Sequence, residues 1–513
     1  MGAMNSSEAM VEADACYLAL KAHDARFDGS FFTGVTSTGI YCRPVCRVRL
    51  PKRENCRFFR LAAQAERDGF RPCLRCRPEL APRGFVWSMQ DASLVLAVQA
   101  AQLLDDPGAW DGESASVDAL ARRLGISDRH LRRIFEAHFG VTPVQYLQTR
   151  RLLNAKQLLT DTGLPITRIA FVSGYASVRR FNAAFVQHYG LNPSGLRAAG
   201  GVRASQRTTI RLGYRPPYDI RAMLEFFRRR QLSGVEWVSA QAGDLSLGRT
   251  IQLELQGQPH RGWIWATFDA SRCQLALRVS DSLREVLPLL LPRVRGMLDL
   301  DADPQAINAV LHAAFPTGDG LRVPGTLDGF ELAVRAVLGQ QVTVAAGRTF
   351  AQRLADRFGT AIETPHAQLN RLFPSAQTLA LVSHDELGSL GIVKQRQAAI
   401  LALSRAVLDA RLSLNAAGAY PETIAALTSL PGIGDWTAQY IAMRALRWPD
   451  AFPAADIALH KAIGLRGSKH AAREAEAASQ AWRPWRSYAV IRTWLGAAAA
   501  PGPTDLSDKG KPR

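Results

Sequence analysis

The pattern of hydrophobic and polar positions predicts two similar helical units joined by one long helix. In each unit a short helix, a turn at a glycine and a second helix follow one another, with the turns at Gly125 and Gly174. Ser127 and Ser177 precede the second helices and can accept hydrogen bonds from their first N–H groups. Apolar residues over 142–159 recur with the helical period, which predicts an amphipathic connecting helix between the units.

The second helix of each unit carries polar, mostly basic residues opposite its apolar residues. This outward set is Arg129, His130, Arg132 and Arg133 in the first unit and Arg179, Arg180 and Asn182 in the second. Two such units in tandem predict two helix-turn-helix elements, because a recognition helix presents basic side chains to DNA. A generic all-helical bundle is the alternative interpretation.

Outside this region the pattern changes along the chain. Residues 8–23 predict a helix, and residues 27–42 predict a strand, a turn and a strand. A small α/β layer is expected from strand-like runs at 209–214, 246–257, 263–268 and 273–279. Beyond about residue 297 the period is helical, with helices expected near 306–315, 328–358, 374–382, 396–411 and 419–429.

Four of the seven cysteines form two close pairs that lie far apart in the sequence. Cys42 pairs with Cys46 and Cys73 with Cys76, which gives C-x3-C, a gap of 26 residues and C-x2-C. A tetrahedral Zn²⁺ site requires two such pairs, because each pair spans one edge of the tetrahedron. The spacing predicts one zinc ion. It leaves open whether the zinc is only a structural clip or whether one thiolate is chemically reactive.

Charge and composition narrow the class of protein. The 513 residues carry a formal net charge of +18, which favours a polyanion as partner because neutralised phosphates release counterions. Arginine enrichment by a GC-rich genome is the alternative explanation. No apolar run approaches the ~18 residues of a membrane span, and the N-terminus has no secretory pattern. With the reduced thiolates that zinc needs, these features predict a cytoplasmic protein without a membrane partner.

The cysteine region resembles a known family. FFTGVTSTGIYCRPVCR, PKREN and GFRPCLRC are similar to the N-terminal zinc domain of the Ada adaptive-response proteins, over nearly all of residues 10–80. The resemblance implies that Cys42 takes a methyl group from a methyl phosphotriester in DNA, with Cys46, Cys73 and Cys76 as the remaining zinc ligands. The formal charge of zinc with four thiolates, about −2, would fall to about −1 when Cys42 becomes a thioether. We expect tighter DNA binding to follow, and a stoichiometric transfer, because nothing converts the thioether back to a thiolate.

Basic residues crowd these cysteines more densely than a solvated surface requires. Arg43 and Arg47, which directly follow the first two cysteines, are expected to belong to a patch that faces DNA phosphates. A methyl phosphotriester is neutral, so the negative cluster does not repel it as it would repel an ordinary phosphate.

The tandem helical units resemble the AraC-type DNA-binding domain, on the segment VSGYASVRRFNAAFVQHYGLNPSGLR. In that family each recognition helix enters a major groove. The resemblance implies base contacts from within residues 128–133 and 177–182, with Arg132 and Arg179 as DNA-binding candidates. Such an activator implies promoter DNA and RNA polymerase as partners.

A third DNA-binding pattern lies at residues 427–464. LPGIG followed by a helix predicts a helix-hairpin-helix, in which Gly432 and Gly434 allow a tight turn and free N–H groups hold a phosphate. Asp456 follows Gly434 by 22 residues, in a proline-containing loop before a helix. Taken alone, Asp456 is better interpreted as a helix N-cap. The spacing, however, marks the helix-hairpin-helix DNA glycosylases.

RPPYD and WRPWRSYAVIRTWL narrow this resemblance, over about 206–500, to the AlkA type of 3-methyladenine DNA glycosylase. It implies that Asp456 stabilises the oxocarbenium ion that forms as the N-glycosidic bond breaks. It also implies an aromatic pocket for a positively charged alkylated purine. The pocket residues nominated by position are Trp436, Tyr440, Trp494 and Phe226, and for each of them core packing is the alternative.

Two positions refine the expected activity. Bifunctional relatives carry a Schiff-base lysine where Trp436 stands, so we expect a monofunctional enzyme that leaves an abasic site. Gln341 stands where AlkA-type enzymes insert a leucine into the gap left by the flipped base. A glutamine can fill this space and hydrogen-bond the orphan base. The sequence contains no PCHR motif, so no O6-methylguanine repair is expected.

The sequence therefore predicts a multidomain, mostly α protein with a small α/β zinc domain, an all-α tandem helix-turn-helix domain, an α/β layer and an all-α helix-hairpin-helix domain. The expected parts are 1–88, 89–204, 205–320, 321–500 and a disordered tail, 501–513. The expected function is alkylation repair of double-stranded DNA together with its transcriptional control, by a monomer. The alternative is a methylation-responsive regulator whose C-terminal half only binds DNA.

Overall fold

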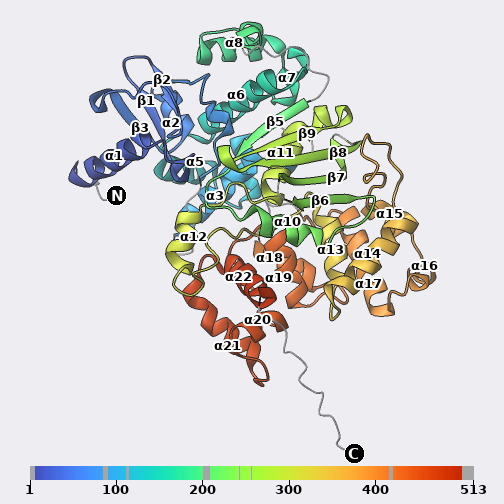
Figure 1. Ribbon diagram of the computed structural model, residues 1–513. Helices are drawn as coiled ribbons and strands as arrows, with labels where there is room; N and C mark the ends of the chain where they lie inside the picture. The colour runs from blue at the N-terminus through green and yellow to red at the C-terminus, as the bar shows by residue number, and fades with distance from the viewer. Residues whose placement is uncertain are drawn as a thin grey trace, which may run out of the picture.

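The computed structural model describes residues 6–84, 91–110, 115–199, 208–241, 243–255, 257–414 and 420–499. The tail predicted over 501–513 lies outside these residues. In Figure 1 the amino-terminal sheet (blue) lies at the upper left and the last helices (orange to red) lie at the bottom, with a five-stranded sheet (green) between them. The predicted fold class, multidomain and mostly helical with two small sheets, is confirmed.

The amino-terminal module, residues 6–84, is built on a four-stranded sheet of order β3-β1-β2-β4. Its elements are α1 (Ser6–Lys21), β1 (Phe32–Val35), β2 (Ile40–Cys42), β3 (Cys56–Phe59), α2 (Ala62–Arg67) and β4 (Arg71–Pro72). Strand β2 pairs with β1 in antiparallel and with β4 in parallel orientation. Because Cys42 ends β2 and Cys73 directly follows β4, this parallel pairing brings the two cysteine pairs together.

The helical region that follows contains both predicted helix-turn-helix elements. Its helices are α3 (Ala92–Asp105), α4 (Val117–Arg123), α5 (Asp128–Phe139), α6 (Pro143–Asp161), α7 (Ile166–Val172), α8 (Val178–Tyr189) and α9 (Pro193–Ala199). Ser127 and Ser177 cap α5 and α8 as predicted, each through its side-chain oxygen. Gly125 and Gly174 have positive φ angles, 65° and 83°, which a residue with a side chain rarely adopts.

The carboxy-terminal half, residues 208–499, begins with an antiparallel five-stranded sheet of order β5-β9-β8-β7-β6. Its strands are β5 (Thr208–Gly213), β6 (Glu236–Gln241), β7 (Asp244–Leu255), β8 (Gln258–Asp269) and β9 (Gln274–Val279). All four predicted strand runs are present, and β6 is an additional edge strand. Helices α10 (Ile220–Arg228) and α11 (Leu287–Met297) accompany the sheet.

The rest of this half is helical. The helices are α12 (Pro304–Leu311), α13 (Gly329–Leu338), α14 (Val344–Phe358), α15 (Ala376–Ala380), α16 (His384–Ser389), α17 (Lys394–Leu408), α18 (Tyr420–Thr428), α19 (Asp435–Arg444), α20 (Ile457–Ala462), α21 (Ala471–Ala478) and α22 (Arg486–Ala499). The single helix expected near 328–358 is wrong, because α13 and α14 are separated by a turn at residues 339–343. Gln341 in this turn has a φ of 53°, which an α-helix cannot contain.

The hydrophobic cores cross from one part of the chain to the next. One core joins α6 and α8 of the helical region to the five-stranded sheet and to α11. Its fully buried members include Phe181 and Phe185 from α8 and Ile264 and Leu277 from the sheet. In the described part of the chain, no helix is both long and apolar enough to cross a membrane.

Candidate metal centre and candidate active site

The four predicted ligand sulfurs converge at one edge of the amino-terminal sheet. The Sγ atoms of Cys42, Cys46, Cys73 and Cys76 all lie within 4.8 Å of one another. Sulfurs around a tetrahedral zinc with Zn–S bonds of ~2.3 Å lie roughly 3.8 Å apart. Cys76 is half-buried and the other three cysteines are buried, so the cluster is shielded from water. The set fits one Zn²⁺, in agreement with the predicted cofactor.

Arg43 and Arg47 occupy different environments. Arg47 is exposed, as a phosphate-facing residue must be. Arg43 is buried, and its Nε donates to Asp28 Oδ1 at 2.8 Å while its Nη1 donates to the carbonyl of Cys76 at 3.0 Å. The exposed position that we expected for Arg43 is therefore replaced by an internal one, in which Asp28 compensates the charge.

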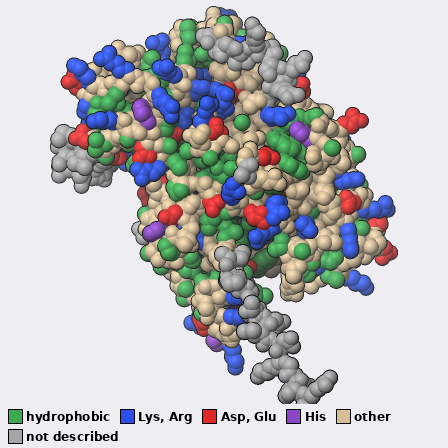
Figure 2. All heavy atoms as spheres, in the orientation of Figure 1, with side chains coloured by type: hydrophobic (Ala, Val, Ile, Leu, Met, Phe, Trp, Pro, Cys, Tyr) green, Lys and Arg blue, Asp and Glu red, His purple; other side chains and the backbone are tan. Residues whose placement is uncertain are grey.

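The recognition helices α5 and α8 present their basic faces to solvent. Arg132 and Arg179 are both exposed. Arg132 is paired with Asp128 one turn earlier, with 2.8 Å between Nε and Oδ1. Figure 2 shows Lys and Arg side chains gathered over the upper part of one face, where Figure 1 places the amino-terminal sheet and α6.

Asp456 forms the centre of the second site. It precedes α20 and caps this helix, because its Oδ1 accepts from the N–H of Leu459 at 2.7 Å. Two indoles donate to the same carboxylate, Trp494 Nε1 to Oδ1 and Trp436 Nε1 to Oδ2, each at 3.0 Å. The three donors fix the plane of a carboxylate that is 8% exposed.

The aromatic residues predicted around Asp456 lie together. Tyr440 is one turn after Trp436 on α19, and their rings stack with 5.4 Å between centroids and 17° between planes. Trp494 of α22 closes the other side, 6.1 Å from the ring of Tyr440. Burial raises the pKa of the Tyr440 phenol, but Arg444, which donates to its oxygen at 2.5 Å, and Arg230 together bring that pKa below its ordinary value.

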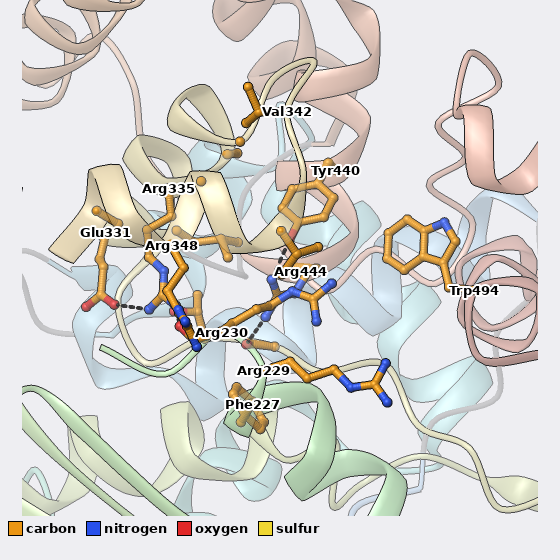
Figure 3. A pocket seen from close by; sticks show the side chains of 18 of the residues that line it. Phe227, Arg229, Arg230, Glu331, Arg335, Val342, Arg348, Tyr440, Arg444 and Trp494 are labelled. Carbon is orange, nitrogen blue, oxygen red and sulfur yellow. Dashed lines mark hydrogen bonds and ion pairs between the residues drawn. The ribbon is translucent and has the colours of Figure 1, made fainter. Parts of the chain in front are cut away.

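These groups line a cavity of about 500 Å³ between α10, α13, α19 and α22. Tyr440, Arg444 and Arg230 lie at the centre of Figure 3, and Trp494 faces them from the neighbouring helix. At another wall Arg335 pairs with Glu331 at 2.8 Å and with Glu236 at 3.1 Å, so these buried charges compensate one another. The cavity thus offers aromatic faces, cationic donors and one carboxylate to a bound molecule.

Two of the nominated residues, the pocket candidate Phe226 and the wedge candidate Gln341, do not line the cavity. Phe226 is buried behind the wall, where the guanidinium carbons of Arg230 and Arg444 lie 3.7 and 4.8 Å from its ring centroid. The adjacent Phe227 lines the cavity instead. Gln341 is exposed at the tip of the turn between α13 and α14, next to Val342, which does line the cavity.

The predicted helix-hairpin-helix turn precedes α19. Gly432 has a φ of 75°, and Gly434 is the N-cap of α19 without a capping side chain, which leaves the first N–H groups available. Gln340 holds this turn, because its Nε2 donates to the Gly432 carbonyl at 2.8 Å and to Thr437 Oγ1 at 2.9 Å.

Sequence reasoning did not nominate Gln340, Arg230 or Arg444. A signal for Arg444 was present, because it follows Tyr440 by one helical turn and therefore shares its face of α19. Gln340 acts across a long sequence separation, and no local pattern marks it. Arg230 follows Phe226 by four residues and packs on its ring, but only the fold brings it to Tyr440.

Family models match four consecutive parts of the chain. These are the metal binding domain of Ada (15–79), a helix-turn-helix domain (120–199), the AlkA N-terminal domain (209–328) and the HhH-GPD superfamily base excision DNA repair protein (334–487).

Similar proteins agree with this order of parts. The probable bifunctional transcriptional activator/DNA repair enzyme AlkA of Mycobacterium tuberculosis is 36% identical over 491 residues, which cover 93% of this chain and 95% of that protein. DNA-3-methyladenine glycosylase 2 of Escherichia coli is 33% identical over 285 residues, 55% of this chain and 95% of its own length. The bifunctional transcriptional activator/DNA repair enzyme AdaA of Bacillus subtilis is 33% identical over 37% of this chain and 86% of its own length. The chain therefore belongs to the family of bifunctional transcriptional activator/DNA repair enzymes in which Ada and AlkA domains are joined.

Proposed function

We propose that this protein repairs alkylated DNA and controls the transcription of repair genes. The amino-terminal module accepts methyl groups from DNA methyl phosphotriesters, and the carboxy-terminal half is a glycosylase for alkylated purines such as 3-methyladenine. One observation carries the glycosylase proposal: two indole N–H groups orient the Asp456 carboxylate at the wall of an aromatic cavity. A protein that only bound DNA would not need a buried carboxylate held in this way.

In the proposed base excision, the damaged nucleotide leaves the duplex and its base enters the cavity. Trp436, Tyr440 and Trp494 offer π-faces to a positively charged alkylated purine. As the N-glycosidic bond breaks, its electron pair leaves with the base, and the Asp456 carboxylate stabilises the positive charge that develops at C1′. Water then adds its oxygen to C1′ and releases a proton, which gives an abasic site.

The enzyme is proposed to be monofunctional. Trp436 occupies the position at which bifunctional relatives carry a Schiff-base lysine, and its indole is already engaged with Asp456. Incubation with a 3-methyladenine oligonucleotide should release free base while the strand stays intact until alkali is added. Asp456→Asn should lower release by about 10³-fold, because one oriented charge at the transition state contributes at this level. Equal release by this variant, or none by the wild type, would favour the alternative in which this half only binds DNA.

In the proposed methyl transfer, Cys42 Sγ attacks the methyl carbon of a phosphotriester. The S–C bond forms as the C–O bond breaks, and the phosphodiester leaves as an anion. Bound zinc would keep the four sulfurs ionised and hold the thioether in place afterwards. Cys42, Cys46, Cys73 and Cys76 would hold the ion. Peptide mass spectrometry after reaction with methylated DNA should find one methyl group on Cys42, and a methyl group on another cysteine would contradict this assignment.

The regulatory part of the proposal concerns α5 and α8. Arg132 and Arg179 on the exposed faces of these helices would contact promoter DNA in two major grooves. In the amino-terminal module, Arg47 would contact phosphates near the zinc cluster. In the glycosylase half, the N–H groups after Gly432 and Gly434 would hold a phosphate near the damaged base. We further propose RNA polymerase as the partner of the activator, a monomeric state, and a location in the bacterial cytoplasm at the nucleoid. The divisions 1–88, 89–204, 205–320 and 321–500 remain our proposed domains.

A further inference from the structure

A buried arginine joins the two halves of the molecule. Arg215, at the start of the carboxy-terminal half, has no solvent exposure. Its Nε donates to the carbonyl of Asp28 at 2.8 Å and its Nη2 to that of Arg83 at 3.0 Å, both in the amino-terminal module. Its Nη1 donates to the carbonyls of Asp301 and Ala302, each at 3.0 Å. All four acceptors are main-chain oxygens, so the guanidinium fixes backbone from both halves around one charge.

Asp28 connects this arginine to the zinc ligands. While its carbonyl accepts from Arg215, its carboxylate binds the guanidinium of Arg43, and both acidic and basic side chains are buried. Arg43 directly follows Cys42 in the chain. Its main-chain N–H points to Cys76 Sγ at 3.4 Å, and its Nη1 donates to the Cys76 carbonyl at 3.0 Å. A continuous set of hydrogen bonds therefore runs from the glycosylase half to the metal ligands.

We propose that Arg215 is a positioning residue for the zinc cluster, through which the glycosylase half supports the methyl-accepting site. Partners outside the first coordination shell orient metal ligands, and their loss commonly weakens metal binding 10–100-fold. Arg215 supplies this support from a part of the chain that contains no metal ligand. By linkage, any change in this support when Cys42 is methylated is matched by an equal change in the free energy of docking of the two halves. The coupling between methylation and docking rests on the proposed function. The support of the zinc ligands by Arg215 does not rest on it.

The test uses the full-length zinc protein and four substitutions. Arg215→Met removes all four hydrogen bonds, and Asp28→Asn removes the charge that holds Arg43 while it leaves the carbonyl that Arg215 binds. Arg215→Lys keeps the charge but can reach at most three of the four carbonyls. Arg486→Met is the matched control, because Arg486 is similarly buried and binds the carboxylate and the main-chain carbonyl of Asp450 within the carboxy-terminal half.

Zinc release to a chromogenic chelator is measured first, and the thiolate-to-metal absorption of the cobalt-substituted protein second. Arg215→Met and Asp28→Asn should each speed zinc release about tenfold and alter the cobalt spectrum. Arg215→Lys should release zinc at a rate between the wild-type rate and that of Arg215→Met, and Arg486→Met should match the wild type. Base release by Asp28→Asn should stay within about twofold of the wild type, because this variant changes no group near Asp456.

Wild-type zinc release in Arg215→Met, or equal acceleration in Arg486→Met, overturns the proposal. If Arg215→Met does not fold, the rate of zinc release from Arg215→Lys is the test. A rate above that of the wild type supports the proposal, and a rate equal to that of the wild type overturns it. Failure of the proposed function is a separate result, seen when the wild type neither accepts a methyl group nor releases a base. The zinc and cobalt measurements remain decisive in that event, since they depend on neither activity.

Discussion

Asp456 uses its two carboxylate oxygens for different partners. Oδ1 caps α20 and accepts from Trp494, while Oδ2 accepts from Trp436 alone. The capping role and the catalytic role are therefore compatible, because the cap fixes the carboxylate that the reaction would use. Each indole has a further function, since its ring forms part of the aromatic wall.

The N–H of Trp494 can be separated from its ring by the substitution Trp494→Phe. We expect base release to fall about tenfold while an aromatic wall remains, because one hydrogen bond to a charged group contributes roughly 1.5–3 kcal/mol. Single-turnover release of 3-methyladenine measures the effect. Trp265→Phe, in the five-stranded sheet, is the control. A loss no larger than that of the control would show that the indole donor does not orient Asp456.

At this scale the sequence was informative where a motif fixed both residue type and spacing. Cys42, Cys46, Cys73 and Cys76 converge as predicted, and Trp436, Tyr440 and Trp494 surround Asp456. Arg43 was not predictable, because its partner Asp28 lies 15 residues earlier and a count of basic residues does not reveal ion pairs. Of the two arginines against the ring of Phe226, Arg230 follows the end of α10 and Arg444 ends α19, and only the fold brings these two arginines together.

Among the elements, the turn between α13 and α14 contacts both the turn at Gly432 and the cavity. Gln340 holds the Gly432 turn, and the next residue, Gln341, is exposed in a left-handed conformation. Val342 then returns to the cavity wall. In the proposed function, three consecutive side chains would thus serve the phosphate-binding turn, the space left by a flipped base and the pocket.

Gln341→Ala should therefore weaken base flipping. We expect release of 3-methyladenine from a normally paired duplex to fall about tenfold, because the gap in the base stack would be left unfilled. Release from a mismatched duplex should fall less, because a mismatched base costs less free energy to unpair and unstack than a normally paired one. Gln341→Leu tests whether filling alone suffices, and it should restore release. Equal losses on both duplexes would contradict a role in flipping.

The residues of this turn explain why the sequence predicted one helix over 328–358. The apolar period continues through the turn, and neither glutamine is a strong helix breaker. The interruption depends on contacts that are remote in sequence, such as the bonds of Gln340 to Gly432 and Thr437. The packing is close as well, since a Cβ added to Gly347 would lie 3.1 Å from the Cα of Gly339. Local propensity cannot specify such an interruption, whereas it did specify the caps at Ser127 and Ser177.

At the scale of the whole molecule, polar contacts join the modules in addition to the shared cores. Glu66 of the amino-terminal module accepts from the hydroxyl of Tyr41 at 2.9 Å and from that of Thr149, on α6, at 2.6 Å. His188 of α8 lies nearby, with 3.6 Å between its Nδ1 and Glu66 Oε2. The residue before Cys42 is thus connected to the connecting helix and to the second recognition helix.

This junction should make stability depend on pH. Burial raises the pKa of Glu66 from 4.5 to about 7. The folded state therefore holds a proton that the unfolded state has lost, and stability falls as pH rises between these values. The difference is about 3 kcal/mol at most, from 1.36 kcal/mol per pKa unit. Urea unfolding followed at the helical region should show this fall in the wild type and a smaller one in Glu66→Gln. Identical pH profiles would contradict the assignment.

The central claim is that one chain performs two independent repair reactions. Its most direct test is a duplex that carries both a methyl phosphotriester and 3-methyladenine, incubated in turn with wild type, Cys42→Ala and Asp456→Asn. Mass spectrometry of the protein and chromatography of the released base are performed on the same sample. The wild type should gain one methyl group on Cys42 and release the base, Asp456→Asn should only gain the methyl group, and Cys42→Ala should only release the base. A wild type that lacks either product, or variants that lose both together, would contradict the account.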